Sequence, residues 1–195
     1  MLAFIALAAV IVAIPGPSVL LVMKATMLRG RASAMLVALG VLCGDLVWAA
    51  AAVAGITALI VASGPAFEAL RIAGAAYLIY LGLRLLLARG AEPGHAPQRR
   101  SQRSFVEGLL CELSNPKSLI VFTSVIPQFL STDPPALEVA AYGVLFAALG
   151  FASLMVYVWA LSAGRRVVRG KLTDRLLRGS GAVLIAFGVD LVADR

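Results

Sequence analysis

Two tripeptides interrupt apolar runs of this sequence: PGP at positions 15–17 and NPK at positions 115–117. A proline lacks an amide donor and clashes with the carbonyl group four residues earlier. PGP should therefore release the carbonyls of Ile11 and Ala13, and NPK that of Glu112. In hydrocarbon, an unpaired backbone group is tolerated only against protein or a water-lined cavity. Two such breaks in one chain indicate a polar site inside an apolar protein.

Each tripeptide also contains the signature of a helix start. Asparagine is a favoured N-cap residue and proline a favoured first helical residue, so Asn115 and Pro116 predict a half-helix that begins inside the apolar run. Pro17 and Ser18 fit the same pattern. A helix start presents free amides and about half a positive charge, to which Lys117 adds a full charge. These groups suit a carboxylate ligand.

One acidic residue lies at a matching depth. Asp45, Pro17 and Lys117 each lie about 18–22 Å along their apolar runs at about 1.5 Å per residue, near the middle of a hydrocarbon core of about 30 Å. An ionisable group at this depth is a functional candidate by default. Asp45 is predicted to hold an exchangeable proton or a substrate ammonium group; a structural ion pair with Lys117 and simple proline kinks stay as alternatives. The predicted substrate-binding residues are Pro15, Gly16, Pro17, Ser18, Asn115, Pro116 and Lys117.

The elements that must position these residues are membrane helices. The 195 residues are 61% apolar and 14% charged, with a mean hydropathy of +0.95, whereas soluble domains are about 45–50% apolar and about 25% charged. A span needs about 20 residues, and the first apolar run is expected to be retained because no basic residue precedes it. The apolar runs predict six helices, at 2–27, 33–62, 66–88, 105–130, 136–163 and 177–193.

A polar linker divides the six helices into two groups of three. The linker covers 90–104, between a first repeat over 1–89 and a second over 105–195. An odd number of helices inverts the second repeat, and matched Gly/Pro interruptions in two such halves point to a transporter's binding site. The predicted fold is an all-α membrane protein with one transmembrane transporter domain over 1–195. Its six transmembrane helices form two inverted three-helix repeats, with helices 1 and 4 broken at PGP and NPK.

The charge distribution predicts the orientation and the partners. The net charge is +7, and most of the 17 basic residues fall in three loops that six helices would place on one face. Basic loops mark the cytoplasmic side, which makes the chain a multi-pass protein of a bacterial plasma (inner) membrane with a cytoplasmic linker. The expected partners are the lipid bilayer, protons and a small-molecule substrate. A nucleic acid is not expected, because the basic residues follow the membrane pattern.

The remaining polar and small residues of the apolar runs have less defined roles. Glu107 is expected at the cytoplasmic interface of the fourth run, and the role of Glu112 stays open. Cys43 and Cys111 lack the CxxC or Cys/His spacing of metal and redox sites, so both are expected to pack as small apolar residues. A GxxxG motif at 40–44 is typical of close helix packing. No metal ligands and no catalytic residues are predicted.

Three longer segments carry these motifs: PGPSVLLVMKATMLRGRASAMLVALGVLCGD, LRIAGAAYLIYLGLRLLL and SFVEGLLCELSNPKSLIVFTSVIPQF. Together they resemble the LysE/RhtB superfamily of amino-acid exporters, nearest its homoserine/threonine-exporter branch, over nearly the whole chain. The resemblance implies secondary efflux of amino acids coupled to proton entry, and a homodimer is compatible with it. Ile14 stands where a threonine is frequent in the family, which bears on the substrate class. The positions that match the family's motifs are Pro15, Gly16, Pro17, Asp45, Asn115, Pro116 and Lys117.

The favoured hypothesis is therefore a transporter and not an enzyme. It exports amino acids or related small zwitterionic metabolites by alternating access around a midplane site, with a proton gradient as energy source and no cofactor. One alternative is a cation or metal exporter, which needs several carboxylate, thiolate or imidazole ligands inside the membrane. Another is a thiol-relay membrane protein, which needs cysteines on both broken helices. A purely structural subunit would leave the matched breaks unexplained.

Overall fold

The computed structural model describes residues 1–55, 57, 62–87, 99–164, 179, 182–186 and 189, and these include no strand, as the all-α prediction requires. The elements in chain order are α1 (Leu2–Ala13), α2 (Pro17–Arg29), α3 (Arg31–Val53), α5 (Gly64–Leu87), α6 (Arg99–Leu113), α7 (Pro116–Ile120), the π-helix η1 (Val121–Val125), the 3₁₀-helix η2 (Ile126–Phe129) and α8 (Ala136–Gly164). The predicted sixth helix over 177–193 lies largely outside the described residues.

Two helices, α3 and α8, are each long and apolar enough to cross a membrane. Two bent helix pairs pass the same test when each pair is taken together. The first pair joins α1 to α2 with a bend of 51°, and the second joins α6 to the α7–η2 segment with a bend of 48°. The described residues thus hold two candidate spans, or four if each bent pair is one span.

Each bend lies at the start of a helix. Gly16 is the N-cap of α2 and Pro17 its first residue, without a side-chain cap. Asn115 caps α7, and its Oδ1 accepts a hydrogen bond of 3.1 Å from the backbone N of Lys117. The side chain of Asn115 therefore binds one of the backbone amides that were predicted to be available to a ligand.

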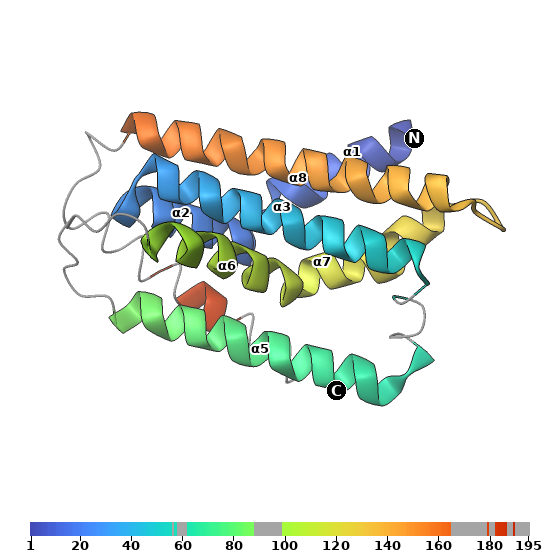
Figure 1. Ribbon diagram of the computed structural model, residues 1–195, viewed down its shortest axis with the longest axis horizontal. Helices are drawn as coiled ribbons and strands as arrows, with labels where there is room; N and C mark the ends of the chain where they lie inside the picture. The colour runs from blue at the N-terminus through green and yellow to red at the C-terminus, as the bar shows by residue number, and fades with distance from the viewer. Residues whose placement is uncertain are drawn as a thin grey trace.

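The helices pack around α3. Figure 1 shows α3 running along the molecule between α8 on one side and the α6–α7 segment on the other, with α5 at the outer edge. α2 also contacts α3, α6 and α8, whereas α1 packs mainly on α8. Helix α3 thus contacts both bent pairs and also α8.

Glycines bring α3 and α6 to backbone contact. A Cβ atom at Gly40 would lie 2.1 Å from the Phe105 carbonyl oxygen, and one at Gly108 would lie 2.1 Å from the Val37 carbonyl oxygen. The GxxxG motif at 40–44 therefore packs closely, as predicted. This contact sets the register in which the polar residues of α3 and α6 face each other.

The buried apolar residues form two clusters with the polar residues between them. The first cluster includes Val37 and Val41 of α3 and packs against the second half of α8. The second includes Trp48 and packs against α1 and the first half of α8. Asp45 lies between Val41 and Trp48 on α3, so the carboxyl stands between two apolar layers. We call these the inner cluster, on the side where α2 ends, and the outer cluster, on the side where the chain begins.

Candidate functional site

A small cavity lined by both polar and apolar residues lies between the inner and outer clusters, with a volume of about 40 Å³. Its walls come from the bent helix pairs, α3 and α8. Small-molecule pockets typically measure about 300–1,000 Å³, so the cavity has room for a few water molecules but not for an amino acid. The lining residues are Val12, Gly16, Ser18, Val19, Val41, Asp45, Glu112, Asn115, Lys117, Ser118, Phe146, Gly150, Ser153 and Leu154.

Most of the residues that the sequence singled out lie at this cavity. Gly16, Ser18, Asp45, Asn115 and Lys117 line it. The three prolines of the tripeptides are not lining residues; they shape the two helix starts from which the lining side chains project. The structure thus brings the PGP and NPK segments and Asp45 to one place, and the binding roles of these residues stay predictions.

Glu112, whose role the sequence left open, is the centre of the polar contacts. It is 3% exposed. The hydroxyl groups of Ser18 and Ser118 donate to its Oε2 and Oε1 respectively. Asn115 Nδ2 lies 3.3 and 3.4 Å from the two oxygens and 3.2 Å from Ser18 Oγ. One carboxyl group therefore ties the start of α2 to the start of α7.

A sequence signal for Glu112 does exist. Residues three or four apart on a helix share a face, and Glu112 precedes Asn115 by three positions and Pro116 by four. An acid one turn ahead of a predicted helix break is thus placed to reach the polar groups of that break. Its partner Ser18 lies 94 positions away, which no local pattern indicates.

Asp45 has an unsatisfied oxygen at the cavity. Its side chain is 2% exposed, and its Oδ1 has no hydrogen-bond partner among the described residues. The carboxyl groups of Asp45 and Glu112 both line this cavity. On the α8 side, Gly150 has no side chain and so leaves room for the Asp45 carboxyl. A Cβ atom at Gly150 would lie only 3.4 Å from Asp45 Oδ2. A buried carboxyl without a full set of partners is costly, so Asp45 suits a cationic ligand or a proton.

Lys117 reaches across the cavity to the other helix break. Its Nζ donates to the Ile14 carbonyl oxygen at 2.9 Å. The lysine stem passes over Gly16, where a Cβ atom would lie 3.7 Å from Lys117 Cδ. An ammonium group at the carbonyl end of α1 also compensates the negative end of the helix dipole. The cation predicted to bind a carboxylate thus holds a backbone carbonyl in this structure.

Two side chains of α8 complete the partners of the first break. Ser153 Oγ donates to the Val12 carbonyl oxygen at 3.3 Å, and Tyr157 Oη donates to that of Ala13 at 3.4 Å. Carbonyl groups at a break need such partners in an apolar medium. Helix α8 therefore fastens the end of α1.

The other carbonyl groups predicted to be released by the prolines are also paired. The Ile11 carbonyl accepts from Ile14 N at 3.3 Å, and the Glu112 carbonyl accepts from Asn115 N at 3.1 Å. Both are hydrogen bonds between residues three positions apart, which tighten the last turn of a helix. The start of α2, which has no side-chain cap, therefore leaves backbone amides for a ligand, whereas at the start of α7 Asn115 already binds the amide of Lys117.

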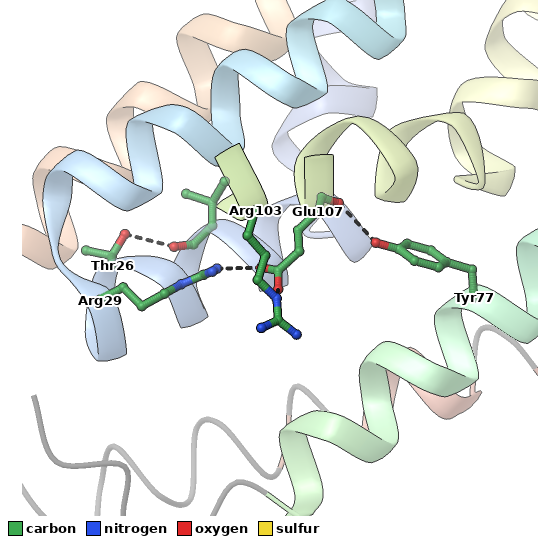
Figure 2. A network of polar contacts seen from close by, with 6 residues as sticks. Thr26, Arg29, Tyr77, Arg103 and Glu107 are labelled. Carbon is green, nitrogen blue, oxygen red and sulfur yellow. Dashed lines mark hydrogen bonds and ion pairs between the residues drawn. The ribbon is translucent and has the colours of Figure 1, made fainter. Parts of the chain in front are cut away.

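A second polar network lies toward the end of the molecule where α2 ends (Figure 2). Arg29 Nη2 lies 2.8 Å from Glu107 Oε2 in an ion pair that lacks hydrogen-bond geometry, and Arg103 Nε lies 3.9 Å from Glu107 Oε1. Tyr77 Oη donates to the Glu107 carbonyl oxygen at 3.3 Å. The network joins α2, α5 and α6. Sequence alone put Glu107 at an interface, whereas the structure buries its side chain against neighbouring helices.

The described ranges contain few residues that could support metal or thiol chemistry. These ranges contain no group of three or more His, Cys, Asp or Glu residues that could hold a metal ion. Cys111 is buried and Cys43 half-buried, and both are free thiols.

The comparison with known proteins adds the family. Residues 9–195 match the family model described as LysE type translocator. The chain belongs to this family. Among the LysE type relatives, the threonine efflux protein of Escherichia coli (strain K12) is 31% identical over 191 residues, which cover 93% of this chain and 91% of that protein. No solved structure matches the chain.

Two further relatives of this LysE type translocator have a similar extent. The leucine efflux protein of Salmonella choleraesuis (strain SC-B67) is 31% identical over 178 residues, which cover 90% of this chain and 84% of that protein. The uncharacterized membrane protein YrhP of Bacillus subtilis (strain 168) is 29% identical over 209 residues, which cover 97% and 96%. The resemblance inferred from the PGP and NPK segments is therefore confirmed.

Proposed function

We propose that this protein is a secondary active exporter of amino acids or related small zwitterionic metabolites in a bacterial plasma membrane. The observation that carries the proposal is the cavity between two bent helix pairs, which holds the buried acids Asp45 and Glu112 and the cation Lys117. The relatives named threonine and leucine efflux proteins support amino acids as the substrate class.

Each charged group of a zwitterion has a counterpart at this cavity. The substrate carboxylate binds Lys117 and the start of α2, where Ser18 and Val19 precede the first intrahelical bond, from Leu20 N to the Gly16 carbonyl. The substrate ammonium binds Asp45. A proton and an ammonium group compete for the same carboxylate, so the arrival of one favours the release of the other. This competition is what an antiporter requires.

The transport cycle needs the cavity to open to each side in turn. In our proposal, six helices form two inverted repeats over 1–89 and 105–195, joined by the cytoplasmic linker 90–104, and the repeats rock around the site. The similar bends of the two helix pairs, 51° and 48°, support equivalent roles for them. The basic loops lie in the cytoplasm, as the positive-inside rule requires.

The first test is export from proteoliposomes that contain the purified protein and labelled amino acids. We expect threonine or leucine to leave faster than from protein-free vesicles, and faster again when protons can flow inward. Asp45→Asn should abolish the acceleration by the pH gradient, because the neutral amide cannot exchange a proton. Asp133→Asn, a matched change at an exposed residue, should keep it. If no amino acid of a broad panel leaves faster than from protein-free vesicles, the proposal fails.

The network around Glu107 should control access from the cytoplasmic side. Arg29 and Glu107 connect α2 to α6, which line the cavity from different bent pairs, and both side chains are largely buried. Glu107→Gln leaves the guanidinium group without its carboxylate, which favours the state in which α2 and α6 separate. We expect a cysteine placed at Val41, on the cavity wall, to react at least about tenfold faster with a membrane-impermeant maleimide in Glu107→Gln than with Glu107 intact. A tenfold increase corresponds to a shift of about 1.4 kcal/mol toward the state in which α2 and α6 are separated.

Arg103→Gln is the matched control for this experiment. Arg103 approaches the same carboxylate only to 3.9 Å, and its side chain is 65% exposed. Exposed pairs contribute little, so this variant should label at the wild-type rate. The background lacks both native thiols through Cys43→Ser and Cys111→Ser. Equal labelling of wild type and Glu107→Gln would contradict a gating role for the Arg29–Glu107 pair.

A further inference from the structure

We infer that the Glu112 carboxyl is an internal ligand of the transport site, which occupies the donors of the substrate carboxylate until a substrate displaces it. The inference rests on the proposed function. It adds the group with which the substrate competes, and it makes a carboxylate a requirement of the transported molecule.

The donors around Glu112 are arranged as they would be around a bound carboxylate. Ser18 binds one oxygen and Ser118 the other, and the Asn115 amide reaches both. These donors belong to different bent pairs, one at the start of α2 and two at the start of α7. A ligand between the two helix breaks would find these three side chains, and in this structure the ligand is Glu112.

Among the described residues, the Glu112 carboxyl accepts hydrogen bonds only from the neutral side chains of Ser18, Asn115 and Ser118. The nearby ammonium of Lys117 donates instead to the Ile14 carbonyl at 2.9 Å. Hydrogen bonds from hydroxyl and amide groups can pass from one carboxylate to another with little net change in number or type. A substrate carboxylate can therefore take over these donors by a like-for-like exchange.

The displaced carboxylate has a cation within reach. Lys117 is close enough to Glu112 for electrostatic attraction, so its ammonium group can contact both the displaced Glu112 carboxyl and the substrate carboxylate. Lys117 then compensates one carboxylate and Asp45 compensates the substrate ammonium, which leaves one negative charge for the hydroxyl and amide donors of the two helix starts. An amine without a carboxylate cannot displace Glu112 in this way.

The small size of the cavity has the same origin. Glu112 fills the space between Ser18 and Ser118, and the remaining volume of about 40 Å³ is too small for an amino acid. Withdrawal of this side chain would join that volume to the donors. Substrate entry and displacement of Glu112 are therefore one event.

The test compares the binding of an amino acid with that of its amide, which lacks the negative charge. The full-length protein in lipid nanodiscs is titrated calorimetrically with L-threonine, L-threoninamide, L-leucine and L-leucinamide. A competing internal ligand lowers the apparent affinity by the fraction of protein that it leaves free. Glu112→Gln should therefore bind the amino acids at least about tenfold more tightly than wild type if Glu112 occupies the donors about 90% of the time. Affinity for the amides should change far less.

Two further variants keep this test decisive. Glu138→Gln removes the same charge at a carboxylate that accepts from Ser131 N at 3.1 Å near the start of α8, and it should leave all four affinities as in wild type. Glu112→Asp keeps the charge but withdraws the carboxylate by one methylene group, so it should also tighten amino-acid binding relative to amide binding. This second variant carries the test if Glu112→Gln does not fold.

The possible outcomes distinguish failure of the Glu112 inference from failure of the proposed exporter function. Equal weakening of acids and amides in both Glu112 variants would mean that Glu112 only holds the helices together, and the inference would be wrong while the exporter stands. If wild type and variants bind none of the four compounds, the titration is repeated with an amino acid that the export panel identifies and its amide; if that panel identifies none, the proposed function fails and the inference with it.

Discussion

Gly108→Ala should disturb the close packing of α3 and α6 and lower the Tm of the protein. The new Cβ atom would lie 2.1 Å from the Val37 carbonyl oxygen, and backbone cannot turn aside as a flexible side chain can. Overpacking costs about 1–3 kcal/mol and occasionally more. For a chain of this size, about 3 kcal/mol corresponds to a decrease in Tm of about 6–12 °C. Thermal unfolding of the detergent-purified protein, followed by size-exclusion chromatography, measures this decrease.

Gly64→Ala is the matched control. No atom of the described residues lies within 4 Å of a Cβ atom at Gly64 of α5, and alanine is a better helix former than glycine. Its Tm should therefore equal or slightly exceed that of wild type. The close contact of α3 with α6 would be contradicted if Gly108→Ala and Gly64→Ala unfolded at the same temperature.

Lys117→Met should reduce amino-acid export by about 100-fold or more. Lys117 is the one cationic side chain among the described residues that line the cavity. The substitution leaves Asp45 and Glu112 without a compensating charge and removes the hydrogen bond to the Ile14 carbonyl. An unpaired buried charge costs about 3–5 kcal/mol, and about 2.8 kcal/mol is a factor of about 100. The measurement is the initial rate of labelled threonine or leucine efflux from proteoliposomes with equal protein content.

Arg31→Gln provides the comparison for Lys117. It also removes one positive charge, but Arg31 is exposed and lies 3.2 Å above the Trp159 ring, outside the cavity. We expect export within the range of wild type for Arg31→Gln and partial export for Lys117→Arg, which keeps the charge. Wild-type export by Lys117→Met would exclude a role of this ammonium group in transport.

The positions of the prolines and the number of residues along each apolar run were enough to predict that the main polar groups lie at one depth. The rise per residue in a helix is constant, so PGP, NPK and Asp45 could be placed at a common depth before their contacts were known. The structure places Gly16, Asp45 and Lys117 around one cavity. The six-helix repeat architecture stays a prediction, because much of its last helix lies outside the described residues.

The contacts within the cavity could not be predicted in the same way. A membrane helix is apolar on most of its faces, so periodicity does not fix its rotation. Without that rotation, the sequence could not show that Glu112 meets Ser18, or that Ser153 and Tyr157 of α8 reach the end of α1. Lys117 was expected to face a ligand, and its bond to the Ile14 carbonyl depends on the bend between α1 and α2.

The two apolar clusters have a consequence for the electrical behaviour of the protein. In a membrane, the inner and outer clusters are two layers of low dielectric constant, and the cavity between them is a more polarisable region. The transmembrane voltage is then divided between the layers, and moving one charge across the whole membrane is worth about 2.3 kcal/mol per 100 mV. In the proposed transport cycle, a proton would cross part of this voltage on its way to Asp45 and the rest after the site has opened to the other side. Under that proposal, the membrane potential contributes to each half of the cycle separately.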